Sequence, residues 1–285
     1  MKLEVVRPGF ATTVQDLGRP GHAALGVGRS GAADRGSYRL ANRLVGNPEG
    51  AAALEVTLGG LVLRACGVTT VAVTGADCPL SKVGLNGPIT LRPGEELALG
   101  TAVSGLRCYV AVRGGIDVPP VLGSRATDTL GKLGPPPVTA GTLLPIGPAP
   151  RTFPVVDLAP RAARPADPVL RVTPGPRRDW FAAPDELLST VYTVSPDSDR
   201  VGIRFTGPAL SRARHDELPS EACVPGSVQV PPSGQPILFH ADHPATGGYP
   251  VIAVVEEEDL DLAAQLRPGQ TVRFRPASCG ARRGC

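Results

Sequence analysis

Polar side chains gather at the ends of two short predicted strands between residues 220 and 250. Ser227–Val230 alternates polar and apolar residues as a half-buried strand does, and Ile237–Phe239 is an apolar run typical of a buried strand. The polar residues at or near the strand ends are Glu221, Gln229, Asp242 and Thr246. Gly247-Gly248 comes next, ahead of Tyr249-Pro250, and glycine allows a positive φ or a close approach of the backbone to a ligand. The pattern fits a site presented on loops, and it is also typical of turns on an ordinary barrel.

Common sequence motifs for phosphate and metal sites are incomplete in this chain. Gly131-Lys132 does not belong to a P-loop, because Ala126 and Leu133 stand where the first glycine and the magnesium-binding hydroxyl are needed. The run Gly26–Gly31 matches G-x-G-x-x-G ahead of a predicted helix, yet strands follow it instead of a βαβ unit. Backbone N–H groups at the start of that helix are a candidate anion site, and an ordinary loop is the alternative. The four histidines show no metal-ligand spacing, so no metal site is predicted.

The composition favours many short strands over long helices. The 285 residues include 35 Gly and 32 Pro, which mark turns, and 42% hydrophobic residues, which allow a core. A net charge of +3 is too small to indicate nucleic-acid binding. The sequence shows no apolar run of membrane-spanning length and no secretory signal, and its six cysteines form no CxxC pair. We therefore expect a soluble cytoplasmic protein that binds neither membrane nor nucleic acid.

The chain is predicted to form two domains, 1–150 and 165–285, joined by a Pro- and Ala-rich linker at 148–168. One helix is expected near 32–45, with Asp34 in its first turn and an apolar face at helical spacing. Arg92-Pro93-Gly94-Glu95 and Arg267-Pro268-Gly269-Gln270 occupy matching late positions in the two halves, and each precedes a predicted strand. This repeat indicates two related β-barrel domains.

Longer motifs in both halves are shared with one protein family. They lie at residues 9–19 (GFATTVQDLGR), 30–34, 41–47, 111–116, 176–181, 199–202, 220–221, 229–231 and 246–250 (TGGYP). With these motifs in order along nearly the whole chain, the sequence resembles the C subunit of bacterial 5-oxoprolinases. The same family includes allophanate hydrolase subunit 2 and a subdomain of the carboxyltransferase part of urea carboxylase.

The resemblance implies a mainly β fold of two cyclophilin-like β-barrel domains with a few short helices. It also implies a complex with the B and A subunits of 5-oxoprolinase that hydrolyses the lactam of 5-oxo-L-proline to L-glutamate at the expense of ATP. Because no P-loop is present, ATP is expected to act through the complex.

The shared motifs, together with the polar residues at the ends of the predicted strands, supply candidate site residues. The candidates for catalysis are Glu221, Asp242 and Arg19. Those for substrate binding are Gln15, Asp16, Ser30, Gly31, Asp34, Asn42, Arg200, Gln229, Thr246, Gly247, Gly248 and Tyr249. The carboxylates would transfer protons, and the arginines and glycine N–H groups would stabilise developing negative charge. Ala222 and Pro244-Ala245 depart from the usual family pattern, which affects the assignment of the substrate.

Two other functions fit the same resemblance. One is a biotin-dependent carboxyltransferase that acts on urea or a related amide, with the biotin carrier on another chain or domain. The other is a regulatory protein of a pair that binds a kinase inhibitor, in which the polar cluster would bind a partner and catalyse nothing.

Overall fold

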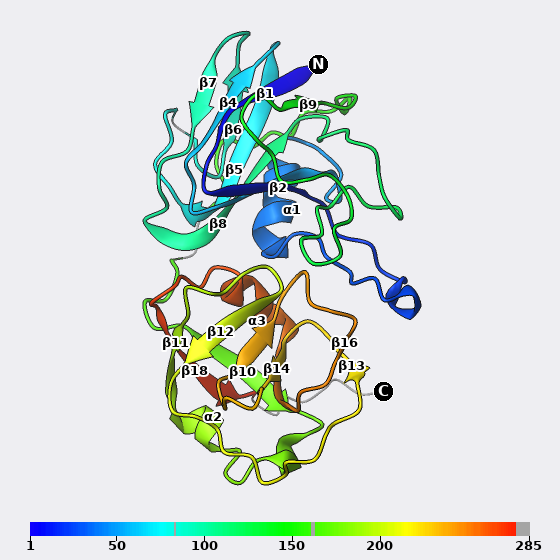
Figure 1. Cartoon of the computed structure of the whole chain (residues 1–285). Helices are drawn as coiled ribbons and strands as arrows, with labels where there is room; N and C mark the ends of the chain where they lie inside the picture. The colour runs from blue at the N-terminus through cyan, green and yellow to red at the C-terminus, as the bar shows by residue number, and fades with distance from the viewer. Residues whose placement is uncertain (83, 161–162, 278–285) are drawn as a thin grey trace, which may run out of the picture. The chain divides into compact units, whose positions relative to one another are not determined.

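The computed structural model describes residues 1–82, 84–160 and 163–277, and the chain divides into two compact units, Met1–Arg164 and Pro165–Cys285. Strands dominate both units and the helices are short, so the expectation of a mainly β chain is confirmed (Figure 1). No helix in the described ranges is long and apolar enough to cross a membrane.

The N-terminal unit contains two antiparallel sheets and one helix of substantial length. The first sheet has the order β7-β4-β1-β9 and the second the order β2-β3-β8-β5-β6. The strands are β1 (Lys2–Pro8), β2 (Ala11–Gln15), β3 (Ala53–Thr57), β4 (Leu61–Ala65), β5 (Thr69–Asp77), β6 (Pro88–Leu91), β7 (Glu96–Ala98), β8 (Ser104–Val112) and β9 (Leu143–Pro145). The helical segments are η1 (Ala23–Leu25), a single 3-10 turn, and α1 (Arg35–Leu44).

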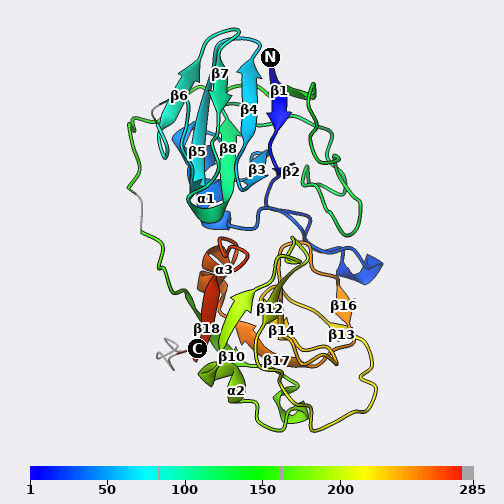
Figure 2. The ribbon, with the colours of Figure 1, turned by 60° about the vertical axis from the view of Figure 1, so that its left-hand side comes forward.

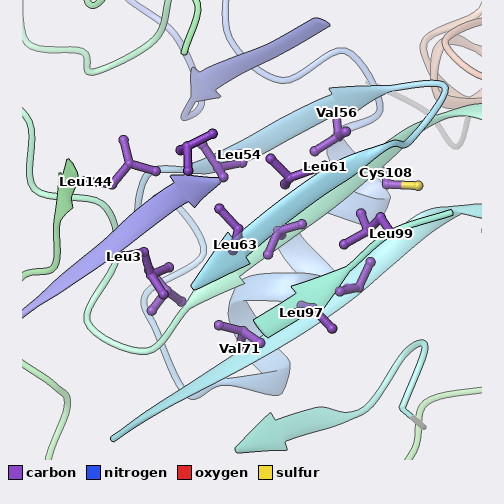
Figure 3. Packing of buried hydrophobic residues seen from close by; sticks show 14 of the residues in the cluster. Leu3, Leu54, Val56, Leu61, Leu63, Val71, Leu97, Leu99, Cys108 and Leu144 are labelled. Carbon is purple, nitrogen blue, oxygen red and sulfur yellow. The ribbon is translucent and has the colours of Figure 1, made fainter. Parts of the chain in front are cut away.

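Alternating residues of β3, β5 and β8 pack into two different layers of this unit. Leu54, Val71 and Cys108 point into a large apolar cluster that also includes Leu3 and Leu63 from the other sheet (Figure 3). The intervening positions of the same strands are filled mostly by small residues, Ala53, Ala72 and Ala111, which belong to a second cluster with α1. Because successive side chains on a strand point to opposite faces, one face of the sheet packs on strands and the other on a helix.

The face of α1 that packs on this sheet is the one predicted from its periodicity. Tyr38, Ala41 and Leu44 are buried among the alanines of β3, β5 and β8, and Figure 2 shows α1 lying against these strands. The helix begins slightly later than expected, because Asp34 is its N-cap instead of a member of its first turn. The Asp34 carboxylate accepts a hydrogen bond of 2.8 Å from the Ser37 N–H.

The C-terminal unit is a closed barrel of seven strands in the order β10-β17-β14-β15-β12-β11-β18. They are β10 (Val169–Pro174), β11 (Val191–Val194), β12 (Gly202–Thr206), β14 (Ser227–Gln229), β15 (Ile237–Phe239), β17 (Val251–Val255) and β18 (Thr271–Pro276). A two-stranded sheet of β13 (Glu221–Ala222) and β16 (Thr246–Gly247) is separate from the barrel, and the helical segments are η2 (Arg178–Trp180), α2 (Glu186–Ser189) and α3 (Glu257–Ala263). Trp180, the one tryptophan of the sequence, is buried in the apolar cluster of this unit.

Much of the predicted linker lies on the N-terminal unit. The Arg113 guanidinium donates to the carbonyl oxygens of Pro150 and Thr152, and it lies 4.5 Å from the ring centre of Phe153. Val156 and Ala159 pack against the cluster around α1. Residues 161 and 162 of this linker, like the last eight residues of the predicted second domain, lie outside the described residues.

The repeated four-residue motif forms the same turn in both units. The Arg92 N–H donates to the Glu95 carboxylate and the Glu95 N–H to the Arg92 carbonyl, at 2.8 and 3.0 Å. Arg267 and Gln270 exchange the equivalent bonds, at 3.2 and 3.0 Å. The glycine of each turn has φ +82° and donates its N–H to the end of a neighbouring strand, at the carbonyl of Ala65 in one unit and of Val194 in the other. The four-residue match in the sequence therefore corresponds to the same turn structure in both units.

We expect Gly94→Ala and Gly269→Ala to lower the free energy of unfolding of their units by similar amounts, about 1 kcal/mol each, because both glycines are left-handed and have open space around the added methyl group. Gly114→Ala should cost more, since its added Cβ would lie 2.3 Å from the Gly147 carbonyl oxygen. Urea unfolding of the three variants measures this, and a clear difference between the first two would contradict the equivalence of the turns.

Candidate functional site

Some of the candidate site residues form one cluster in each unit. Gln15, Asp16, Arg19 and Ser30, here called the N-terminal cluster, all contact the segment 121–134. Glu221, Gln229, Thr246 and Gly247, here called the C-terminal cluster, meet where β13 and β16 lie beside β14. Each cluster is described within its own unit.

Asp16 binds the segment 121–134 through its carboxylate. Its Oδ1 accepts from the Gly18 N–H at 2.7 Å and from the Ser124 hydroxyl at 2.6 Å, and its Oδ2 accepts from the Arg125 N–H at 2.6 Å. Three donors on one buried carboxylate make it an anchor for two loops. Its predicted role in binding substrate has no support in this arrangement and remains a prediction.

Gln15 and Ser30 converge on one carbonyl group. The Gln15 Nε2 and the Ser30 Oγ donate to the Thr127 carbonyl oxygen at 2.9 and 3.2 Å, and the Thr127 N–H donates to the Val14 carbonyl at 2.8 Å. Ser30 has φ +55°, a backbone conformation that costs a non-glycine residue about 1–2 kcal/mol. The bonds of this residue and its neighbours must hold that conformation in place.

Arg19 is buried beneath the same segment, with 1% of its surface exposed. Its Nη2 donates to the Ala126 carbonyl at 2.5 Å, its Nε donates to the Val121 carbonyl at 3.4 Å, and its Nη1 lies 3.7 Å from the Asp128 carboxylate. In this conformation the guanidinium binds peptide carbonyls and a carboxylate of the chain itself. Its assignment as a catalytic residue stays a prediction.

Two loops cross closely behind the N-terminal cluster. The Arg19 N–H donates to the Arg29 carbonyl at 2.7 Å, and the Ala32 N–H donates to the Asp16 carbonyl at 2.8 Å. Gly31 has φ +96°, and a Cβ on it would lie 2.7 Å from the Gly18 nitrogen. The glycine is thus required by the loop crossing as well as by its backbone conformation.

Side chains of the chain itself bond to the two N–H groups that precede α1. The Ala33 N–H donates to the Glu55 carboxylate at 2.9 Å, and the Asp34 N–H donates to the Tyr109 hydroxyl at 2.7 Å. The Tyr109 hydroxyl in turn donates to Glu55 at 2.8 Å, and Arg107 lies 3.4 Å from the other Glu55 oxygen. The anion site predicted at the start of this helix gains no support from these contacts and remains a prediction.

This buried network depends on the uncharged state of its phenol. Burial raises the pKa of Tyr109 well above its usual value, with the charge of Glu55 as the second cause. The hydroxyl therefore keeps its proton and serves as donor and acceptor at once. Nothing in the predicted site pointed to these residues, although a glutamate and an arginine within strands as apolar as β3 and β8 were a signal that could have found them.

Asn42 lies at the opposite end of α1 from Asp34. Its Nδ2 donates to the Ala51 carbonyl at 2.8 Å, and its Oδ1 accepts from Asn47 at 3.0 Å. Asn47 also bonds to β8 and to Gly114, so the amide pair fastens the loop after α1 to the sheet. Asn42 is fully buried in this role, and the prediction that it binds substrate gains no support here.

Glu221 of the C-terminal cluster forms an ion pair with Arg177. Two nitrogens of the guanidinium take part, Nε at 3.2 Å from Oε2 and Nη2 in contact with Oε1. Hydrogen bonding to Arg177 lowers the pKa of Glu221, so the group is ionised at neutral pH. Arg177 was part of a shared motif but was not among the predicted site residues.

Gly247 is placed against Gln229. In the pairing of β13 and β16, Glu221 lies opposite Gly247, and a Cβ on Gly247 would lie 2.8 Å from the Gln229 Nε2. The Gln229 Nε2 also lies 3.7 Å from the sulfur of Cys223, whose pKa is raised by burial. Neither Gly247 nor Gly248 has a positive φ. Gly247 is a glycine because the Gln229 side chain lies too close for a Cβ. The other expectation for this glycine pair, a positive φ, is wrong.

The two remaining charged candidates bind each other. Arg200 and Asp242 form a two-pronged ion pair, with both N–O distances 2.9 Å and both side chains buried. An aspartate held in this way is suited to fixing the loop 240–243 rather than to exchanging protons with a substrate. Thr246 of the C-terminal cluster is exposed, and so are its neighbours in sequence Gly248 and Tyr249, Tyr249 by 46%.

No metal centre is visible in the described ranges, where no three His, Cys, Asp or Glu side chains are arranged to hold an ion. The chemistry available is that of hydrogen-bond donors for a carbonyl group in the N-terminal cluster, and of an ionised carboxylate beside a guanidinium in the C-terminal cluster.

Comparison with known proteins relates this arrangement to a family. Residues 25–276 match the family model described as "Carboxyltransferase domain, subdomain A and B". The chain is 38% identical to the C subunit of the 5-oxoprolinase of Escherichia coli (strain K12), over 95% of this chain and 90% of that protein. It is 36% identical to the urea amidolyase of Lachancea kluyveri, over 96% of this chain and 17% of that protein. The crystal structure of the K. lactis urea amidolyase superposes with a TM-score of 0.89 at 33% identity, over 97% of this chain and 19% of that chain.

We expect Glu55→Gln to destabilise the N-terminal unit by about 3 kcal/mol, because Arg107 would remain buried without its carboxylate and two donors would lose a charged acceptor. Glu96→Gln, which breaks an exposed ion pair with Arg64, should change stability by less than about 1 kcal/mol. Urea unfolding measures both variants. Equal losses in the free energy of unfolding would show that the buried network stabilises the unit no more than an exposed ion pair does.

We expect Arg177→Met to raise the pKa of Glu221 back toward the ordinary glutamate value, since the hydrogen bond to Arg177 is the largest cause of its lowering. An NMR titration of the Glu221 carboxyl carbon measures the shift. Arg178→Met is the control, because Arg178 pairs with Asp185 and not with Glu221. An unchanged Glu221 titration in the Arg177 variant would refute the assigned pair.

Proposed function

Because this chain belongs to the carboxyltransferase family of subdomains A and B, we propose that it is the C subunit of an ATP-dependent 5-oxoprolinase. The observation that carries the proposal is the match to the C subunit of the E. coli 5-oxoprolinase over nearly the full length of both proteins. The urea amidolyase match covers a much smaller part of its relative. In the proposed complex, the A and B subunits work with this chain to convert 5-oxo-L-proline to L-glutamate.

The reaction requires groups that bind a lactam and stabilise charge on its oxygen. A lactam carbonyl is a poor electrophile, so its oxygen must be activated before water adds to the carbon. The N-terminal cluster supplies donors of the kind required, because Gln15 and Arg19 already bind amide carbonyl oxygens of the chain. In the C-terminal cluster, Glu221 is partly exposed and can accept a proton from water once it is released from Arg177, whereas Asp242 is buried in its pair with Arg200.

ATP belongs to the proposed complex and not to a site identified in this chain. The two N–H groups directly before α1 bond to Glu55 and Tyr109, and the Ser37 N–H in its first turn bonds to the Asp34 carboxylate. We therefore assign no step of ATP chemistry to these residues and place nucleotide binding on the partner subunits.

A second candidate is supported by the relatives named for urea chemistry. A carboxyltransferase for urea or a related amide would take a carboxyl group from biotin on another polypeptide, since the only methionine here is Met1 and a Met-Lys-Met biotin attachment motif is absent from the sequence. Both candidates act on a small amide, which the N-terminal cluster would bind in either case.

The test of this proposal combines the chain with its A and B partner subunits and follows 5-oxoproline-dependent ATP hydrolysis. We expect turnover only with all three subunits, and a loss of at least about 100-fold in kcat for Glu221→Gln, the usual effect of removing a general base. Glu217→Gln, an exposed glutamate nearby in sequence, is the matched control. Urea-dependent turnover with a biotin carboxylase, and none with 5-oxoproline, would replace the proposal by the second candidate.

A further inference from the structure

We propose that Gln15 and Arg19 bind the paired C=O and N–H of a cyclic amide or urea, that the segment 121–134 is a lid whose own peptide carbonyls occupy this site in the structure, and that the Thr127 side chain of the lid contacts the ligand once the lid has shifted to admit it. The choice of ligand class rests on the proposed function, and the site itself rests on the contacts described below.

Three polar atoms around the lid are buried without a hydrogen-bond partner among the described residues. They are the Gln15 Oε1, the Thr127 Oγ1 and the Arg19 Nη1, whose nearest charge is the Asp128 carboxylate at 3.7 Å. Leaving a buried polar atom unpaired is unfavourable, because the atom has given up its hydrogen bonds to water. Three such atoms around one segment make the closed arrangement costly, and a ligand that satisfied them would lower that cost.

The lid is held by polar contacts and hardly at all by apolar packing. None of the three apolar clusters found in the described residues includes any residue of 121–134. It is attached instead by hydrogen bonds that Arg19, Gln15 and Ser30 donate to its carbonyl groups and by one that its Ser124 hydroxyl donates to Asp16. A segment fixed mainly by hydrogen bonds can separate from the sheet without opening the core.

Two tight turns give the lid its own internal structure. Val121 and Ser124 exchange backbone hydrogen bonds at 2.7 and 3.2 Å, and the Asp128 N–H donates to the Leu133 carbonyl at 2.9 Å. Leu122 and Lys132 have φ +51° and +54°, conformations unfavourable for residues with a Cβ. Each strained residue lies within one of the two turns, and strain of this kind often occurs in segments that change conformation.

The present contacts show which ligand chemistry the site recognises. Arg19 and Gln15 donate to the carbonyl oxygens of Ala126 and Thr127, which are amide oxygens like those of a lactam or of urea. The Gln15 Oε1 and Thr127 Oγ1 are unused acceptors beside these donors. A lactam presents its C=O and N–H side by side, so one small ring can accept from Arg19 and donate to Gln15. The peptide groups of the lid thus stand in for the substrate amide.

The test measures binding of 2-pyrrolidinone to the full chain, with cyclopentanone as a ring of equal size that has no N–H. We expect 2-pyrrolidinone, and not cyclopentanone, to change hydrogen exchange at the Arg125 and Thr127 amides, whose bonds to Asp16 and Val14 break when the lid moves. Thr127→Val should weaken 2-pyrrolidinone binding about fivefold, the effect of one hydrogen bond worth about 1 kcal/mol.

Thr69→Val is the matched control, because the Thr69 hydroxyl is also buried and unpartnered but lies on β5. Both variants should fold, since each replaces an unpaired hydroxyl by a methyl group of similar shape. Equal binding by the two variants, equal effects of the two rings, or no binding of 2-pyrrolidinone at about 100-fold excess over the protein at millimolar concentration would each overturn the inference. Unimpaired 2-pyrrolidinone binding in a complex that does not turn over 5-oxoproline would count against the proposed function alone.

Discussion

The carboxylate of Glu55 is the interaction on which the N-terminal unit depends for the position of its loops. It joins β3 to β8 through Tyr109 and Arg107, and it fixes the start of α1 through the Ala33 N–H. The chain directly before Ala33 is the loop that crosses Gly18 and carries Ser30. One buried charge therefore fixes the positions of the sheet, the helix and the N-terminal cluster relative to one another. Because the charge is buried, losing any one of its hydrogen-bond partners would be costly.

Local patterns in the sequence were enough to predict the elements that bury one face. The apolar spacing of Tyr38, Ala41 and Leu44 identified α1, and the repeated turns at Arg92 and Arg267 indicated that the units are related. Strands such as β6 and β9 were not foreseen, because a three- or four-residue strand next to proline carries little periodicity. Their pairing with β5 and β1 comes from contacts distant in sequence.

The candidate site was less predictable than the fold, because residue type does not reveal a partner. Arg200 and Asp242 suggested an anion site and a proton carrier, yet 42 residues apart in sequence they neutralise each other. Asp16 was predicted to bind substrate and Arg19 to take part in catalysis, whereas the contacts that the structure shows for them lie within the chain, on Ser124 and Ala126. The residues Thr127 and Ser124 lie in a stretch with no motif, so only the folded chain could identify them.

The placement of the single tryptophan gives the two units different spectroscopic properties. Trp180 is buried in the barrel with the guanidinium of Arg214 5.9 Å from its ring centre, whereas the N-terminal unit contains tyrosines such as Tyr38 and Tyr109 and no tryptophan. Emission excited at the red edge of the indole absorption band therefore reports on the barrel alone. Fluorescence and circular dichroism would coincide during denaturation only if both units lose their structure together.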